Sequence, residues 1–380
     1  MNEKWLIEQF QWLHRHPELS AQEFGTTAFV KDILKSHRIR MLSSGLPTGV
    51  IASVGRKTPG VTVGLRADLD ALPIHEETDL PYASEIPGVM HACGHDFHTA
   101  CMLGAALMLK EREEELPGEV RIIFQPDEEM DGGGAAMAGS GLLDDVQVFY
   151  AGHTYPSFEA GTLGIRPGPV MAAADRFLIR LTGRGGHAAK PETTTDVIPA
   201  MAAVIQSVQT IVSRTVDPFD QAVVSITRVQ AGNSWNIIPG TAEMEGTVRT
   251  LRPEVRASVS EKLKQMANGI AEACGCKAEV EFEFGSDAVL NDKDCCERAA
   301  ETAREMGFQV REQAGTLIAE DFSNYLSLAP GAYIRIGTGG GCDLHTPQFT
   351  ADPGALVPAA RFFATLAEKE LNRLAAGAGC

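Results

Sequence analysis

Residues His91-Ala92-Cys93-Gly94-His95-Asp96-Phe97-His98 place three histidines, a cysteine and an aspartate within eight positions. Thiolate and imidazole are the donors that zinc, manganese or cobalt sites use, and a Cys-x-His spacing allows both groups to reach one small site. A tight turn at Gly94 would let Cys93 and His95 point in the same direction. An isolated Cys-x-His pair is more often a buried cysteine beside helix-capping residues, so the interpretation depends on where further donors lie.

Further candidate donors each follow a predicted buried strand near its carboxyl end. Open α/β sheets place their chemistry at that edge, so carboxylates and histidines there are expected to lie close together. The nearly continuous apolar strand 61–67, for example, stops at an Asp-Leu-Asp segment. The groups identified in this way are Asp68, Glu128, Glu129, His153 and His345.

The combined donor set suits a centre with two metal ions. A single tetrahedral zinc takes four ligands, so five donors favour two cations that share a bridging group. Glu128, which precedes a ligand carboxylate, then remains to act as a general base toward water and to pass the proton to a leaving nitrogen. The predicted ligands are Cys93, His95, Glu129, His153 and His345.

The composition is that of an ordinary globular protein. The 380 residues are 44% hydrophobic and 22% charged, enough for one large domain or two. The formal net charge of −17 argues against a nucleic-acid partner. No secretory leader is recognised, and no apolar run is expected to span a membrane. The eight unevenly spaced cysteines do not resemble a disulfide framework, which favours the reducing cytoplasm.

Residues 175–287 have the pattern of a complete small domain. Their periodicity predicts strand, helix, strand, strand, helix and strand, which is the ferredoxin-like order. The first loop carries His187 behind a glycine-rich run, on a domain that would be able to close over a site. The α/β pattern of residues 1–174 resumes over 288–380, so the predicted fold class is α/β with an inserted domain.

The amino-terminal region predicts two helices. Apolar residues share one face of the first, and His14 and His16 are expected at the surface near its end. The second is expected to open with a capping box at Ser20-Ala21-Gln22-Glu23. Further along, Gly132-Gly133-Gly134 lacks the Lys-Ser/Thr of a phosphate loop, so phosphate binding is not expected.

Seven motifs occur in the order found in one known family. They are Arg66-Ala67-Asp68-Leu69-Asp70-Ala71-Leu72-Pro73, His91-Ala92-Cys93-Gly94-His95-Asp96, Phe124-Gln125-Pro126-x-Glu128-Glu129, Gly183-Arg184-Gly185-Gly186-His187-Ala188-Ala189-x-Pro191, Asn236-Ile237-Ile238-Pro239, Glu320-Asp321-Phe322 and Leu344-His345-Thr346-Pro347. Together they resemble the dinuclear aminoacylase and carboxypeptidase-type metallohydrolases. The most similar branch is the N-acyl-amino-acid amidohydrolases, which includes hippurate hydrolases, N-acetyl-diaminopimelate deacetylases and auxin-conjugate hydrolases.

The resemblance implies a domain organisation and a cofactor. It implies a mixed-sheet catalytic domain of the zinc-exopeptidase type over 1–174 and 288–380, with a ferredoxin-like α+β lid and dimerisation domain over 175–287. Two divalent metal ions per subunit are implied, as zinc, manganese or cobalt, with Cys93 as the bridging ligand where other branches use aspartate. A homodimer formed through the lid domain is implied as well.

The resemblance also implies roles outside the ligand set. Asp68 and Asp96 would orient ligand histidines, as metal sites generally require. His187 would stabilise the oxyanion and would reach the partner subunit's site. Asn236 and Arg249 would hold the α-carboxylate of the substrate, although strands of a lid also keep such residues for structural reasons.

Two departures from the family pattern stand out. Asp127 occupies a position where the branch commonly has alanine; its carboxylate either raises the pKa of Glu128 by like-charge repulsion or faces solvent. Trp235 lies in a loop that replaces a more usual glycine-alanine sequence before Asn236. It either lines a pocket for a bulky acyl group or is buried at a dimer interface.

The implied function is metal-dependent hydrolysis of small N-acetyl or N-aroyl amino acids to a carboxylic acid and a free amino acid, without a nucleic-acid or membrane partner. A metallo-exopeptidase or dipeptidase that cleaves short peptides is the alternative, because the same site cleaves any amide placed correctly. A binding protein that has lost catalysis would lack a ligand or the base, and the sequence contains all of them.

Overall fold

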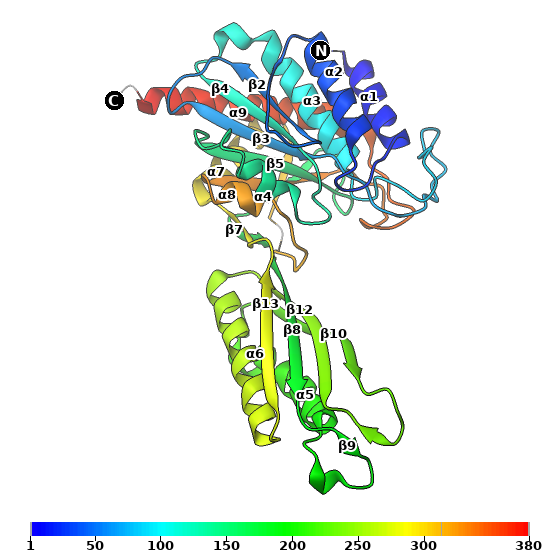
Figure 1. The fold of residues 1–380 in the computed structure, drawn as a ribbon. Helices are drawn as coiled ribbons and strands as arrows, with labels where there is room; N and C mark the ends of the chain where they lie inside the picture. Colours follow the sequence, from blue (N-terminus) through cyan, green and yellow to red (C-terminus); the bar gives the residue numbers. More distant parts are fainter. Residues whose placement is uncertain (1, 313, 379–380) are drawn as a thin grey trace. The chain divides into compact units, whose positions relative to one another are not determined.

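The computed structural model describes residues 2–312 and 314–378, which divide into two compact units (Figure 1). The larger unit comprises the described residues of Met1–Gly168, Leu290–Ala314 and Asp321–Cys380, and the smaller comprises Pro169–Val289 and Gly315–Glu320. The strands β7 (Gly168–Met171) and β14 (Val289–Asn291) pair with each other in a separate two-stranded sheet.

The larger unit is built on an eight-stranded mixed sheet. Its four central strands β4, β3, β5 and β16 run parallel, whereas β1 and β2 at one side pair antiparallel. The carboxyl ends of the central strands therefore meet at one edge, where their loops can converge. In sheet order the strands are β1 (Arg40–Leu42), β2 (Val50–Gly55), β4 (Glu119–Gln125), β3 (Thr62–Asp68), β5 (Val148–Tyr155), β16 (Gly331–Gly337), β6 (Thr162–Gly164) and β15 (Gln309–Arg311).

Helices cover both faces of this sheet, as the nearly continuous apolar strands require. In Figure 1 the helices α1, α2 and α3 lie on one side and α4 and α8 on the other. Leu6, Phe10 and Leu13 of α1 are buried against this core, as the sequence predicts. The helices of the larger unit are α1 (Glu3–Arg15), α2 (Phe24–Ser36), α3 (His95–Glu111), α4 (Gly133–Ala138), α7 (Lys293–Glu305), α8 (Ser323–Leu326) and α9 (Leu356–Ala378), with short 3-10 turns at Glu113–Glu115 and Pro353–Ala355.

The start of α2 differs from the predicted capping box. The helix begins at Phe24, and the Glu23 side chain does not cap it. The Glu18 carboxylate accepts instead from the N–H groups of Gly25 (2.9 Å) and Thr26 (2.7 Å). The open amides of the first turn of α2 are thus satisfied by a residue that precedes the helix. The spacing of a capping box does not predict this contact.

The smaller unit has the predicted ferredoxin-like order. Its four-stranded sheet runs β10-β12-β8-β13, and all neighbouring strands are antiparallel. Apolar faces of α5 and α6 pack with one face of the sheet in a separate core. The elements are β8 (Ala173–Thr182), β9 (Gly186–His187), a 3-10 turn at Pro191–Thr193, α5 (Val197–Thr215), β10 (Ala222–Ala231), β11 (Ile237–Ile238), β12 (Thr241–Thr250), α6 (Pro253–Ala273) and β13 (Lys277–Phe284).

Two compositional predictions can be compared with the structure. The seven described cysteines are free, and Cys380 lies outside the described residues. Among the described residues, α5 is long and apolar enough to cross a membrane by length and composition alone, although Gln206 and Gln209 interrupt its apolar run. Val204, Val208 and Ile211 of this helix are buried in the core of the smaller unit, an arrangement that the core helix of a globular domain also has.

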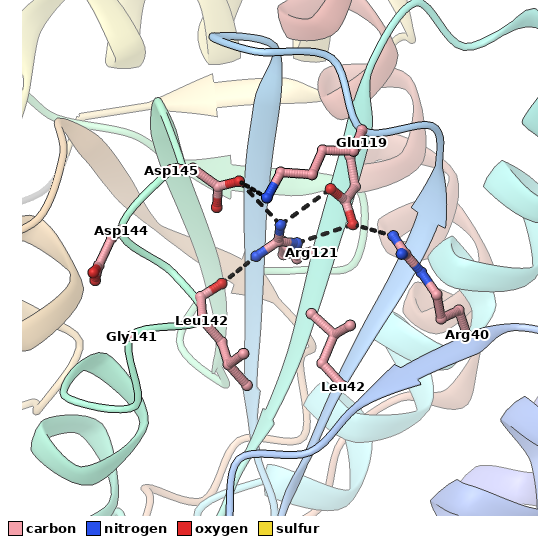
Figure 2. A pocket seen from close by; sticks show the side chains of 9 residues that line it. Arg40, Leu42, Glu119, Arg121, Gly141, Leu142, Asp144 and Asp145 are labelled. Carbon is pink, nitrogen blue, oxygen red and sulfur yellow. Dashed lines mark hydrogen bonds and ion pairs between the residues drawn. The ribbon is translucent and has the colours of Figure 1, made fainter.

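A cavity of about 320 Å³ lies at the amino-terminal end of β4 (Figure 2). The buried Glu119 carboxylate accepts from Arg40 (2.6 Å), and Arg121 contacts Glu119 and Asp145. Lys57 also pairs with Asp145, at 3.3 Å. The basic groups of this cavity are therefore matched by carboxylates, and Glu128 and Glu129 follow the opposite end of the strand.

Candidate metal centre and catalytic base

The turn at Gly94 brings Cys93 and His95 to the same place. Gly94 has φ +84°, and a Cβ atom there would lie 2.5 Å from Thr154 Oγ1, so only glycine fits. The helix α3 begins directly after it at His95. His153 lies within β5, which extends to Tyr155 and is longer than the sequence predicts.

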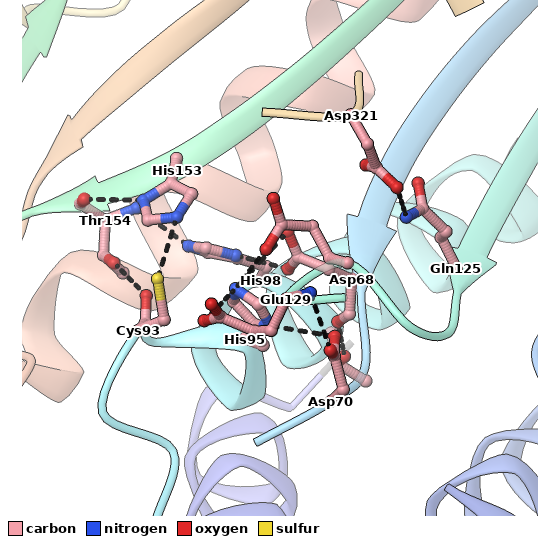
Figure 3. A network of polar contacts seen from close by, with 12 residues as sticks. Asp68, Asp70, Cys93, His95, His98, Gln125, Glu129, His153, Thr154 and Asp321 are labelled. Carbon is pink, nitrogen blue, oxygen red and sulfur yellow. Dashed lines mark hydrogen bonds and ion pairs between the residues drawn. The ribbon is translucent and has the colours of Figure 1, made fainter. Parts of the chain in front are cut away.

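The predicted ligands form two groups that share one sulfur. Cys93, His95 and His153 offer donor atoms within 4.8 Å of one another, and so do Cys93, Glu129 and His345. Cys93 Sγ lies 3.4 Å from His153 Nε2 and 3.3 Å from His345 Nε2. Figure 3 shows His153 beside Cys93 and Glu129 beside His95. Two triads with a common thiolate are the arrangement expected for two bridged cations.

The spacing of these atoms fits divalent cations. Ligands at about 2.0–2.3 Å from one tetrahedral ion are separated by roughly 3.3–3.8 Å. Within one triad His345 Nε2 lies 3.4 Å from Glu129 Oε1, and within the other His153 Nε2 lies 3.4 Å from Cys93 Sγ. His95 Nε2 and Glu129 Oε1 are buried and have no hydrogen-bond partner, which is costly unless a cation takes their lone pairs.

The protonation chemistry of the bridge leads to the same conclusion. Burial raises the pKa of the Cys93 thiol well above its ordinary value, and the Glu129 carboxylate raises it further. A thiolate at this place therefore needs nearby positive charge. Burial lowers the pKa of His153, which keeps its ring neutral and able to donate a lone pair. The residues present thus fit a pair of metal ions.

Hydrogen bonds fix the orientation of two histidines of the predicted ligand set. His153 Nδ1 donates to the Thr154 carbonyl oxygen at 2.9 Å, so Nε2 carries the lone pair that faces Cys93. His95 Nδ1 lies 3.2 Å from Asp70 Oδ1, which orients its Nε2 in the same way. Asp70 was not among the predicted site residues, although its position two residues after Asp68 in an extended segment places it on the same face.

The two predicted orienting aspartates have other partners. Asp68 Oδ1 contacts His98 Nδ1 at 2.6 Å, and its Oδ2 accepts from Arg66 at 2.6 Å; His95 Nε2 is 3.7 Å away. Asp96 Oδ2 lies 2.6 Å from His14 Nδ1. Asp96 therefore contacts a histidine outside the ligand set.

His98 is a second residue that the sequence analysis did not select. It follows His95 by three positions on α3, and helical periodicity places both on one face. Its Nδ1 faces Asp68, and its Nε2 accepts from the Thr154 N–H at 2.8 Å. Both ring nitrogens are thus engaged by protein groups, and the Thr154 hydroxyl in turn donates to the Cys93 carbonyl at 2.9 Å. His98 supports the backbone beside two ligands.

The loop after β4 presents Glu128 and Glu129. Their side chains are 11% and 12% exposed, and Glu128 Oε2 lies 3.9 Å from His95 Nε2. Asp127 adopts φ +58°, a left-handed conformation that aspartate tolerates better than alanine. Burial raises the pKa of Asp127, and the Asp70 carboxylate raises it further. The left-handed backbone at Asp127 shapes the loop that carries Glu128. The two interpretations from the sequence, a raised pKa of Glu128 or a solvent-facing carboxylate, did not include this role.

The backbone of Gly132-Gly133-Gly134 packs against this loop. The Asp127 carbonyl accepts from the N–H groups of Gly132 (3.2 Å) and Gly133 (3.0 Å), and a Cβ at Gly133 would overlap the Pro126 carbonyl oxygen. The Gly134 N–H donates to Asp321 at 2.7 Å. The glycines allow close backbone packing here.

Three predicted site residues lie in the smaller unit. The Ala189 N–H donates to His187 Nδ1 at 3.0 Å, so a neutral His187 ring carries its proton on Nε2. Ser234 donates to Asn236 Oδ1 at 2.8 Å, and Arg249 Nε donates to Thr247 at 3.1 Å. The Asn236 carbonyl accepts from the Ala188 N–H, next to the pairing of β11 with β9. The Trp235 side chain is 95% exposed in the single chain.

Comparison with known proteins identifies related chains. Residues 64–369 match the model of peptidase family M20/M25/M40. An N-acetylcysteine deacetylase of Bacillus subtilis is 44% identical over 363 residues, which cover 95% of this chain and 96% of that protein. An N-acyl-L-amino acid amidohydrolase of Geobacillus stearothermophilus is 45% identical over 280 residues, 73% of this chain and 76% of that one. A solved Bacillus subtilis structure, described as a dinuclear metal-binding peptidase of the M20 family, superposes with a TM-score of 0.89 at 42% identity and covers 97% of this chain and 98% of its own.

Proposed function

The chain belongs to peptidase family M20/M25/M40, and from this premise we propose that it hydrolyses the amide bond of N-acyl amino acids. The products would be a carboxylic acid and a free amino acid. The observation that carries the proposal is the pair of donor triads sharing Cys93, with the Glu128 carboxylate beside them. The relatives named as deacetylase and amidohydrolase support this choice of amide.

Cys93, His95 and His153 would hold one metal ion, and Cys93, Glu129 and His345 the other. Two divalent ions, when bound, supply Lewis-acid polarisation of the amide carbonyl and lower the pKa of water. Zinc, manganese and cobalt all suit a set of thiolate, imidazole and carboxylate donors.

Glu128 would accept the proton of the attacking water and return it to the leaving nitrogen. Its side chain is close to the ligands but remains partly exposed, so water and substrate can reach it. General-base catalysis of this kind contributes about 10²–10⁴-fold to a rate.

His187 would stabilise the oxyanion, in the manner of a hydrogen-bond donor directed at developing charge. Its inferred Nε2–H is supported by the acceptor role of Nδ1 toward Ala189. Asn236 and Arg249 would bind the α-carboxylate of the substrate, because amide and guanidinium groups donate to carboxylates. We propose further that the enzyme acts as a homodimer through the smaller unit, in the cytoplasm.

A metallo-exopeptidase acting on short peptides is the second candidate, and it is supported by the description of the solved Bacillus subtilis relative as a peptidase. Both can be tested with purified enzyme loaded with zinc, manganese or cobalt. The substrates are N-acetyl-cysteine, N-acetyl-methionine, hippurate and a dipeptide with a free amino group. The proposal expects kcat/KM for an N-acyl amino acid at least about tenfold above that for the dipeptide. The reverse order would favour the exopeptidase.

A further inference from the structure

Two buried carboxylates hold the backbone on either side of Glu128. Glu23 Oε1 accepts from the Asp127 N–H at 2.9 Å, and Asp70 Oδ2 accepts from the Glu129 N–H at 3.0 Å. Glu23 is fully buried, and 104 residues separate it from Asp127 along the chain. The amides that precede and follow the proposed base are thus each fixed by a charged acceptor.

The hydrogen bond from Asp127 stabilises an otherwise unfavourable backbone conformation. Asp127 has φ +58°, and left-handed conformations are unfavourable for residues other than glycine. Such conformations persist where surrounding groups determine them. The Asp127 N–H is held by Glu23, and its carbonyl is held by two glycine amides.

Glu23 also fixes its own segment. Its Oε1 accepts from the Ala21 N–H at 2.8 Å, and Ala21 is left-handed as well, with φ +60°. Ser20 donates to Asp70 at 2.8 Å, and the Ala71 N–H donates to the Glu18 carbonyl at 2.8 Å. Residues 18–23 are therefore hydrogen-bonded to Asp70 and Ala71, which follow β3, and to Asp127 in the loop that carries Glu128.

We propose that Glu23 is a positioning residue that fixes Glu128 through the Asp127 amide. This inference rests on the proposed role of Glu128 as the base. The role of Glu23 requires a side chain that is long enough for its acceptor oxygen to reach the Asp127 N–H. A carboxylate is not required for that contact, because an amide oxygen of the same length accepts equally from a backbone N–H.

The test compares Glu23→Gln with Glu23→Asp. Glutamine keeps the reach without the charge, whereas aspartate keeps the charge and withdraws the oxygen by one methylene. Misplacing a catalytic group by about 1 Å can cost a hundredfold in rate. We expect Glu23→Asp to lower kcat about tenfold to a hundredfold, with KM changed less than about threefold and metal content unchanged. Glu23→Gln should keep kcat within about threefold of the original enzyme.

Glu18→Asp provides the matched control. Glu18 lies in the same segment and accepts from the amides of Gly25 and Thr26, so its shortening disturbs α2 without touching the loop of the base. Hydrogen exchange of the metal-free protein gives a readout independent of turnover. The Asp127 amide should exchange faster in Glu23→Asp than in Glu18→Asp or Glu23→Gln.

Three outcomes would overturn the inference: equal kcat for the aspartate and glutamine variants, an equal loss in Glu18→Asp, or unchanged exchange at Asp127. Glu128→Gln, assayed alongside, separates this inference from the proposed function. If Glu128→Gln is inactive while Glu23→Asp is fully active, only the role of Glu23 fails. If Glu128→Gln is fully active, the assignment of the base fails first.

Discussion

His14 Nδ1 lies 2.6 Å from Asp96 Oδ2, although 82 residues separate them in the chain. His14 Nε2 lies 3.2 Å from Glu76 Oε1, so one buried imidazole contacts two carboxylates. The prediction that His14 is a surface residue is therefore wrong. The ion pair connects α1 to the first turn of α3, directly beside the proposed metal centre.

Stability should fall as pH rises, because of His14. Burial opposes protonation, but Asp96 and Glu76 raise the pKa of His14 from 6.5 to about 9. Because the pKa of His14 is higher in the folded state, its contribution to the free energy of unfolding is fully present below pH 6.5. This contribution is lost as pH rises through about 9. The loss should amount to roughly 3 kcal/mol, by the conversion of 1.36 kcal/mol per pKa unit.

Chemical denaturation of the original protein and of His14→Gln between pH 6 and 10 measures this effect. His14→Gln should flatten the profile, and His16→Gln is the control because His16 is half-buried near the end of α1. His91 and Tyr82 also lie near this pair and remain in both variants. An equally steep profile in His14→Gln would contradict the prediction.

Cys93→Ala should lower metal content and thermal stability together. Removing the shared donor leaves each triad with two protein ligands, and metal binding is linked to folding. Cys101→Ala is the control, because Cys101 is buried like Cys93 but lies within α3 and belongs to neither triad. Elemental analysis and melting with and without chelator measure the effect. Full occupancy by two ions in Cys93→Ala would show that the thiolate is not a bridge.

Arg66→Met should destabilise the fold by about 3–5 kcal/mol, because it removes the guanidinium partner of two buried carboxylates. Arg66 donates to Asp68 (2.6 Å), Asp321 (2.7 Å) and Gln125 (2.9 Å), and its side chain is fully buried. Arg361→Met removes an exposed ion pair with Glu3 and should cost only about 0–1 kcal/mol. Urea denaturation compares the two variants, and similar losses would contradict the argument from burial.

His187→Ala should lower kcat about a hundred- to thousandfold and leave metal content intact, because one oxyanion donor is lost. If the donor acts across a dimer, mixing His187→Ala with Glu128→Gln subunits should restore part of the activity. Each mixed dimer would then contain one site with both groups. Verified mixed dimers without any recovered activity would show that His187 serves its own subunit or has no catalytic role.

The sequence predicts those features that depend on periodicity or on the chemistry of short motifs. The strand Glu119–Gln125 follows from its apolar run, and the ferredoxin-like order of the smaller unit follows from alternating strands and long apolar helix faces. The ligand triads follow from donor types at strand ends. Glu23 and His14 were missed or misassigned because their partners Asp127 and Asp96 lie far away in the chain. Local patterns contain no information about such contacts.

Glu128→Gln tests the central claim most directly, since it removes the proposed base and keeps the shape of the side chain. Turnover of an N-acyl amino acid and metal content should be measured on the same preparation. The account predicts two metal ions per chain and a loss of turnover of at least about 10²–10⁴-fold. Near-original turnover with both metal ions bound would contradict it.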